Sequence, residues 1–238
     1  MNVGYGEPCK NFNEVTMKIN WVKESFLLFY DCIIAGFHFI RGVYTLSRLE
    51  QPIISIFGGK RAPQENGYTK QAYDLARMLA KQNISVLTGG GPGIMEAANC
   101  GAASIEKEKK DNKRRTVGIG VRGVDAEFVN PCAYVFHTRY LYIRKWLLMH
   151  YSRAFIVFPG GIGTCEELFE LLDLMKLEKI KQYPVILIGS AYWRDVLNWY
   201  NEAGIKQGYI PAQAKDFITV TDDINQAYSI INKALSKN

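Results

Sequence analysis

The sequence predicts an α/β protein with a mostly parallel sheet of about seven strands and helices on both faces. Short β-branched apolar runs alternate with helical stretches from residue 53 to residue 235. Glycine-rich turns follow three of the apolar runs, and no repeat or low-complexity linker interrupts the pattern. Strands that alternate with helices are typical of a parallel sheet with right-handed crossovers. The 238 residues suffice for one large domain.

The individual elements follow from this alternation. The predicted strands are residues 53–57, 84–87, 116–121, 133–137, 154–158, 184–188 and 217–220. The predicted helices are residues 68–82, 94–105, 140–151, 164–177, 192–202 and 223–235. We therefore expect one domain over residues 51–238, doubly wound in the sense that helices cover both sides of its sheet.

Residues 1–50 precede this pattern and are predicted to form a helical N-terminal extension. Their apolar segment, residues 26–40, has fifteen residues and contains Asp31 and His38. A membrane-spanning helix needs about 20 residues, so we expect a helix packed on the domain or on a second subunit, without stable membrane insertion. The N-terminus lacks a basic cluster ahead of an apolar core, so no signal peptide is expected.

Charge and cysteine usage narrow the function classes. A net charge of +6 is compatible with an anionic ligand, although a solvated basic surface has the same composition. The charged run at residues 106–115 has no interleaved aromatic residues, which argues against nucleic-acid binding. Five cysteines without CxxC spacing and three histidines without ligand spacing predict neither a disulfide framework nor a metal site. A reducing cytoplasm is the expected compartment.

Three glycine-rich turns at the predicted carboxyl ends of strands are the candidate ligand site. Their sequences are IFGGKR, LTGGGPGIMEAAN and VFPGGIGTCEE. Two of them lead directly into a helix, whose unpaired N–H groups and partial positive charge favour a phosphate. The chain has neither a GxxxxGK[ST] motif nor G-x-G-x-x-G in its first turn, so a P-loop or a dinucleotide dehydrogenase is not predicted.

Two charged residues near the third turn have alternative interpretations. Thr164 to Glu167 fits a capping box, in which Thr164 caps the helix and Glu167 bonds back to it. Alternatively, the Glu167 carboxylate, kept ionised by the helix dipole, faces a cation that develops beside a bound phosphate, such as an oxocarbenium-like ribosyl group. Arg144 is either a surface residue of its helix or a clamp for phosphate or base. Spacing alone leaves these alternatives open.

At these residues the sequence resembles the LOG ("lonely guy") phosphoribohydrolases, a family long mislabelled as lysine decarboxylases, and most closely their larger bacterial branch. The resemblance rests on PGGIGTCEE, on GGGPGIMEAAN and on Arg144-Lys145 ahead of the fifth strand. IFGGKR and GSAYW are also similar to family segments, and the match covers about residues 52–200. Gly59 and Lys60 depart from the family, which has a serine and a small residue before Arg61.

The resemblance implies a Rossmann-like fold, a homodimer or higher homo-oligomer, and hydrolysis of a nucleoside 5′-monophosphate such as AMP or N6-modified AMP. By motif position, Arg144 and Glu167 would be catalytic. The substrate would be bound by Gly58, Gly59, Arg61, Gly90, Gly91, Gly93, Met95, Glu96, Lys145, Pro159, Gly160, Gly161, Gly163 and Thr164. No metal or cofactor is implied, and nothing in the sequence suggests a pyridoxal phosphate site.

A second class of function is compatible with the same fold. The expected fold also resembles that of molybdenum-cofactor carriers and of DNA-processing proteins of transformation, which bind their ligands without glycosidic hydrolysis. Retention of both Arg144 and Glu167 favours the enzyme, because carriage requires only the glycine turns.

Overall fold

A computed structural model describes residues 21–62, 67–124 and 128–236. Residues 1–20 of the predicted extension lie outside the described residues. The seven strands form one parallel sheet in the order β4-β3-β2-β1-β5-β6-β7. The strands are β1 (Ile53–Phe57), β2 (Ser85–Thr88), β3 (Thr116–Val121), β4 (Tyr134–Thr138), β5 (Ser152–Val157), β6 (Val185–Ile188) and β7 (Ile218–Thr221).

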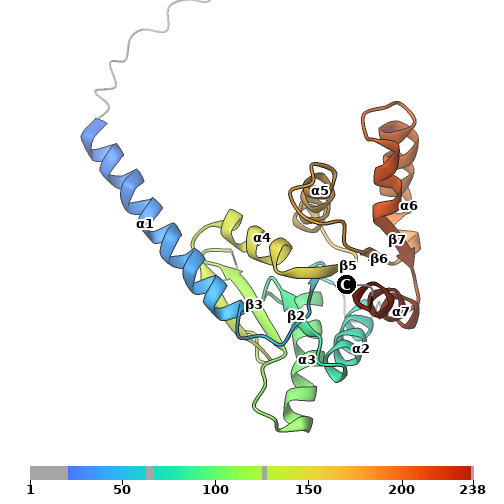
Figure 1. The fold of residues 1–238 in the computed structure, drawn as a ribbon, viewed down its shortest axis with the longest axis horizontal. Helices are drawn as coiled ribbons and strands as arrows, with labels where there is room; N and C mark the ends of the chain where they lie inside the picture. Colours follow the sequence, from blue (N-terminus) through green and yellow to red (C-terminus); the bar gives the residue numbers. More distant parts are fainter. Residues whose placement is uncertain (1–20, 63–66, 125–127, 237–238) are drawn as a thin grey trace, which may run out of the picture.

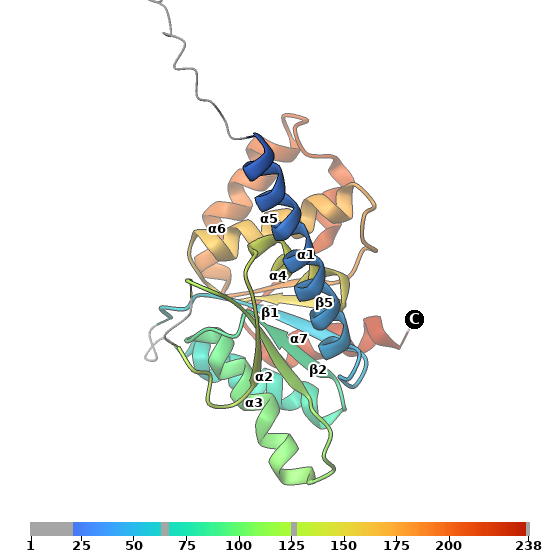
Figure 2. The same cartoon turned by 90° about the vertical axis from the view of Figure 1, so that its left-hand side faces the viewer.

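Helices cover both faces of this sheet (Figures 1 and 2). One apolar cluster packs α1, α4, α5 and α6 against the first face, and a second cluster packs α2, α3 and α7 against the other. The α-helices are α1 (Trp21–Leu46), α2 (Tyr68–Lys81), α3 (Ile94–Lys109), α4 (Leu141–His150), α5 (Ile162–Lys176), α6 (Ser190–Trp199) and α7 (Ile224–Leu235). A π-helical turn, Tyr200–Ile205, extends α6, and a 3-10 segment, Ala212–Phe217, precedes β7.

The predicted fold class is confirmed: the sheet is parallel, has seven strands and is covered on both faces. The central strands β1, β2, β3, β5 and β6 are buried throughout, apart from Arg153 in β5. A strand buried on both faces appears as a continuous apolar run, which is why these strands were found within about two residues.

The order in which strands are added to the sheet reverses between β1 and β5. From β1 the chain builds outward through β2, β3 and β4, then returns to place β5 on the other side of β1. The turns after β1 and β5 therefore diverge, and such a switch point is where ligands bind in open parallel sheets. A hydrogen bond from Gly59 N–H to the Pro159 carbonyl, 3.0 Å, joins the two turns.

Helix α1 is longer than the fifteen-residue apolar segment predicted from the sequence. It has 26 residues, and the stretch Glu24–Leu46 is long and apolar enough to cross a membrane by length and composition alone. The apolar segment stops at Ser25 and Arg41, whereas the helix continues past both residues. Towards its C-terminal end, Phe39 and Val43 pack on the core and Leu46 is buried.

The expectation of no disulfide is wrong, because Cys100 and Cys132 form one. The two residues are 32 positions apart in sequence, but α3 and the segment before β4 bring their Cα atoms to 4.8 Å. Local spacing carries no information about a contact made across two elements. With a disulfide present, cysteine usage no longer argues for a reducing compartment.

Loss of this disulfide is expected to destabilise the domain. Cys132→Ser should lower the free energy of unfolding by about 3–4 kcal/mol, because the unfolded chain regains the entropy of a 32-residue loop. Urea denaturation with and without dithiothreitol measures the effect. Cys32→Ser, at an exposed free cysteine, is the control. If reductant does not change the stability of the wild-type protein, the disulfide has no stabilising role.

Candidate functional site

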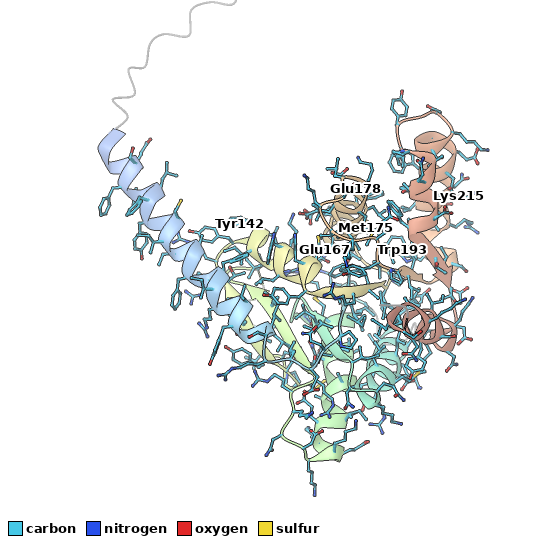
Figure 3. The ribbon with its side chains drawn as sticks, in the orientation of Figure 1. Tyr142, Glu167, Met175, Glu178, Trp193 and Lys215 are labelled. Carbon is cyan, nitrogen blue, oxygen red and sulfur yellow. A yellow bond between two sulfur atoms is a disulfide. The ribbon has the colours of Figure 1, made fainter. Side chains whose placement is uncertain are left out.

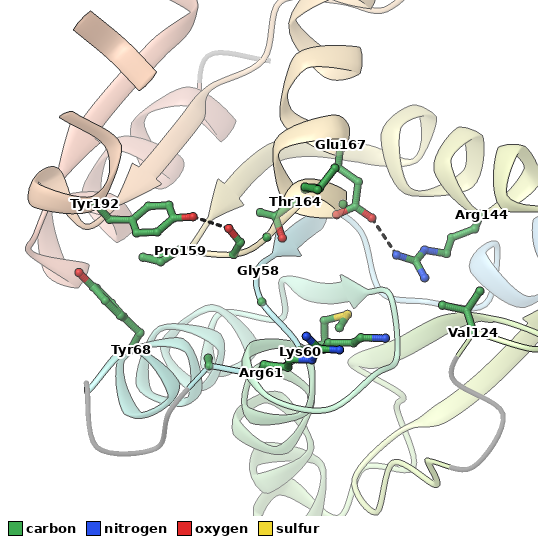
Figure 4. A pocket seen from close by; sticks show the side chains of 17 residues that line it. Gly58, Lys60, Arg61, Tyr68, Val124, Arg144, Pro159, Thr164, Glu167 and Tyr192 are labelled. Atoms are coloured by element: carbon green, nitrogen blue, oxygen red, sulfur yellow. Dashed lines mark hydrogen bonds and ion pairs between the residues drawn. The ribbon is translucent and has the colours of Figure 1, made fainter. Parts of the chain in front are cut away.

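A cavity of about 630 Å³ lies at the carboxyl ends of β1 and β5, at the switch point of the sheet (Figure 4). Its walls are the turn after β1, the turn after β5 with the start of α5, and side chains from α2, α3, α4 and α6. The lining residues are Gly58, Gly59, Lys60, Arg61, Ala62, Tyr68, Met95, Val124, Arg144, Pro159, Gly160, Gly161, Ile162, Gly163, Thr164, Glu167 and Tyr192.

The turn after β5 presents backbone N–H groups to this cavity. The first donors within α5 are Thr164 and Cys165, which both donate to the Gly161 carbonyl. The N–H groups of Gly161, Ile162 and Gly163 precede them, where a helix has no acceptors of its own. The tip of α5 combines these donors with the positive end of the helix dipole, which suits an anion such as phosphate.

The glycines of this turn have different steric roles. A Cβ atom on Gly160 would lie 2.2 Å from Thr164 Oγ1 and 2.8 Å from Gly59 N, so the fold itself requires glycine there. A Cβ atom on Gly161 or Gly163 would meet nothing within 4 Å. Packing within the described chain therefore explains Gly160 alone, and the open space above the other two is the cavity.

This difference predicts separate effects on ligand binding and on folding. Gly163→Ala should keep the fold, or stabilise it by about 0.5–1 kcal/mol because alanine favours helix. It should weaken binding of AMP, the ligand expected from the sequence, at least tenfold by blocking close approach. Gly160→Ala, the matched variant, should lower stability. Calorimetric titration and thermal unfolding separate the two quantities. Unchanged AMP affinity in Gly163→Ala would exclude this turn as the phosphate site.

Arg144 and Glu167 meet at one end of the cavity (Figure 4). Arg144 Nη2 donates to Glu167 Oε1 at 2.9 Å, and the two side chains are 13% and 9% exposed. The capping-box interpretation is therefore wrong. Helix α5 begins at Ile162 after Gly161, without a side-chain cap, so Thr164 lies inside the first turn and Glu167 faces Arg144. The capping-box pattern placed the N-cap three residues too late, at Thr164 instead of Gly161.

Burial favours the neutral form of the Glu167 carboxyl. Desolvation raises the pKa of this carboxyl above the usual value, and the neighbouring Arg144 guanidinium opposes that rise. The expectation that the helix terminus keeps this group ionised omitted the desolvation. A carboxyl with a raised pKa beside a cation in a cavity is typical of groups that take part in proton transfer.

Most of the predicted binding residues line the cavity: Gly58, Gly59, Arg61, Met95, Pro159, Gly160, Gly161, Gly163 and Thr164. Five do not: Gly90, Gly91, Gly93, Glu96 and Lys145.

The turn after β2 packs beneath the site. A Cβ atom on Gly93 would lie 2.5 Å from Gly59 O, and a Cβ atom on Gly90 would lie 3.2 Å from Gly118 Cα. Ile94 N–H donates to the same Gly59 carbonyl at 3.3 Å. This turn therefore supports the turn after β1.

Lys145 lies next to Arg144 on α4 but does not line the cavity. Its ammonium group bonds to Glu166 and, at 2.7 Å, to Glu170. Burial works against the charged form, but the hydrogen bonds to these two carboxylates raise the pKa of Lys145 overall. Lys145 thus fixes α4 against α5, one residue from the Arg144–Glu167 pair.

Sequence reasoning did not place six of the lining residues in the site: Lys60, Ala62, Tyr68, Val124, Ile162 and Tyr192. Lys60 and Arg61 lie on the side of the cavity opposite Thr164 and Glu167, and Tyr68 and Tyr192 lie at the far end from Arg144 (Figure 4). Tyr192 donates to the Gly160 carbonyl and so braces the turn after β5. Tyr192 could have been predicted to line the site, because it lies in the first turn of the helix that follows β6, at the edge of the sheet where the parallel strands end.

Known proteins resemble this chain in sequence and in fold. It is 29% identical over 172 residues to a cytokinin riboside 5′-monophosphate phosphoribohydrolase of Arabidopsis thaliana, covering 69% of this chain and 74% of the relative. It is 29% identical over 157 residues to a pyrimidine/purine nucleotide 5′-monophosphate nucleosidase of Escherichia coli, covering 64% of this chain and 34% of that longer protein.

A molybdenum cofactor binding protein of Rippkaea orientalis has the same fold, with a TM-score of 0.57 and 24% identity over 77% of this chain and 97% of its own. The family described as "Possible lysine decarboxylase" matches residues 95–231, which is more than half of the chain and includes Arg144, Glu167 and the turn after β5. The chain therefore belongs to that family, whose members include the LOG phosphoribohydrolases.

Proposed function

We propose that this protein hydrolyses the N-glycosidic bond of a nucleoside 5′-monophosphate, AMP or an N6-modified AMP, to free base and ribose 5-phosphate. The observation that carries the proposal is the buried Arg144–Glu167 pair in the same cavity as the open N–H groups at the start of α5. The names of the relatives, a phosphoribohydrolase and a nucleosidase, support the same reaction.

The cavity offers groups that suit the phosphate and the ribose of such a substrate. The 5′-phosphate binds at Gly161, Ile162 and Gly163, where helix N–H groups and the dipole favour an anion. The cations of Lys60 and Arg61 on the opposite wall add attraction for the same group. The ribose then extends towards Glu167.

The chemistry follows from placing an anion beside the anomeric carbon. The bond from C1′ to the base nitrogen breaks, its electron pair leaves with the base, and positive charge develops on the ribose. The Glu167 carboxylate stabilises that charge and accepts a proton from the attacking water, whose oxygen bonds to C1′. Arg144 orients the carboxylate and polarises the departing base, which takes up a proton from water while Glu167 returns to water the proton that it accepted.

Product analysis distinguishes this function from the carrier alternative. Incubation with AMP, followed by chromatography, should yield adenine and ribose 5-phosphate in equal amounts. AMP that binds but persists unchanged would support a binding protein of the same fold. Adenosine and free phosphate would show cleavage at the wrong bond. Either of these last two results contradicts the proposal.

A further inference from the structure

Helix α1 carries a continuous stripe of exposed apolar side chains. Phe26, Tyr30, Ile33, Phe37, Ile40 and Tyr44, together the α1 stripe, are each between 51% and 70% exposed. Residues 26 to 44 extend over about 27 Å of helix. Figure 1 shows α1 projecting from the α/β body, and Figure 3 shows its side chains along the projecting part. An apolar patch of this size marks an interaction surface.

The spacing of the residues in the α1 stripe is that of a contact between two helices of a coiled coil. These residues follow one another at intervals of four, three, four, three and four positions, which is the alternation of the a and d positions of a heptad. Such a stripe is matched by a second helix with the same repeat, because each side chain fits between four of its partner's. Gly36 lies beside the stripe, and a Cβ atom there would meet nothing within 4 Å.

From Asp31 onward the opposite face of α1 already has a partner, whereas before it Leu27, Leu28 and Phe29 are exposed as well. Phe39 lies 4.5 Å from Trp146 of α4, measured between ring centroids, and a Cβ atom on Gly42 would meet Leu147. Both charged residues between positions 26 and 44 turn to the domain: Asp31 accepts from Tyr140 at 2.9 Å, and Arg41 donates to Tyr134 at 3.1 Å. The exposed stripe therefore contains no charged side chain, and a guanidinium meets it only at its C-terminal end, where Arg48 lies over the ring of Tyr44 at 4.2 Å.

We propose that the α1 stripe pairs with the α1 stripe of a second copy of this chain, forming a homodimer through a two-helix seam. A buried aromatic side chain covers about 150–250 Å², and the six side chains expose 51–70% of their surface. The stripe therefore offers on the order of 600 Å² per copy, somewhat less than the roughly 800 Å² per partner of a stable interface. An identical stripe on each copy satisfies the two-fold symmetry of such a contact.

A bilayer fits this helix less well than a second copy does. Spanning requires about 20 residues surrounded by lipid, whereas from Asp31 onward one face of α1 lies against α4 and β4. The ten residues before Asp31 rise only about 15 Å, half of the apolar core of a membrane. A bilayer also imposes no heptad spacing.

Sedimentation equilibrium of the full chain tests the pairing. The wild-type protein is expected to sediment as a dimer, and Ile33→Glu/Ile40→Glu as a monomer with at least a hundredfold weaker self-association. Leu28→Glu is the matched control, since Leu28 is 66% exposed on the same helix but lies off the stripe, and it should remain dimeric. All three substituted side chains are exposed, so the thermal unfolding midpoint should not change.

Other outcomes overturn the proposal. A monomeric wild-type protein, or a dimer unaffected by the Ile33→Glu/Ile40→Glu pair, excludes the α1 seam. Flotation with phosphatidylcholine–phosphatidylglycerol vesicles provides the second measurement. If the wild-type protein floats, and Leu28→Glu and Ile33→Glu/Ile40→Glu reduce flotation equally, the occupant of the stripe is a lipid surface.

Discussion

Replacing Glu167 with glutamine is expected to lower kcat for base release from AMP by about 10³-fold while AMP still binds. Removal of a positioned acid–base group typically costs 10²–10⁴-fold in rate, and the amide cannot accept the proton of the attacking water. The amide oxygen still accepts from Arg144, whose Nη2 lies 2.9 Å from Glu167 Oε1, so the pocket keeps its shape. Quenched-flow kinetics and calorimetric titration measure rate and affinity separately.

Glu166→Gln is the control for this substitution. Glu166 stands beside Glu167 on α5 but bonds to Lys145 and does not line the cavity. Its replacement should change kcat less than threefold. If Glu167→Gln turns over at nearly the wild-type rate, Glu167 has no catalytic role.

Replacing Arg144 with methionine is expected to shift the pH dependence of base release as well as to lower the rate. Burial raises the pKa of the Glu167 carboxyl, and Arg144 is the main group that opposes the rise. Activity that needs the ionised carboxylate is lost as pH falls through this raised pKa, so the acidic limb should lie above the usual value for glutamate. Without Arg144 the pKa rises further, and the limb should move to higher pH.

Arg144→Lys keeps the positive charge and serves as the comparison. Its acidic limb should lie closer to that of the wild-type protein, although its rate should fall because lysine lacks the planar geometry of arginine. Profiles of kcat/KM between pH 4 and 9 for the three proteins provide the measurement. Identical acidic limbs in all three would show that Glu167 does not control the pH dependence.

The sequence alone was enough to predict those elements whose structure depends on a local pattern of residues. Buried parallel strands such as β1 and β3 are unbroken apolar runs, and the glycine turns after β1 and β5 mark the edge where a ligand enters. Spacing alone left the roles of Arg144 and Glu167 open, and they were named as a catalytic pair from the motif positions that the family resemblance supplies. Their contact, across 23 positions, depends on how α4 and α5 pack.

Long-range packing was not accessible from the sequence. The turn after β2 has the richest glycine motif, yet Gly93 serves the close approach to Gly59 and stays outside the cavity. The Cys100–Cys132 bond joins two segments that no local pattern relates. Tyr68 and Tyr192 reach the cavity from the starts of α2 and α6, which the order of strands brings together.

The most direct test of the account is a crystal structure of Glu167→Gln with AMP bound. We predict that the phosphate accepts hydrogen bonds from the N–H groups of Gly161, Ile162 and Gly163, and that C1′ faces the side chain at position 167. A phosphate bound elsewhere, or a ribose turned away from that side chain, would contradict the account.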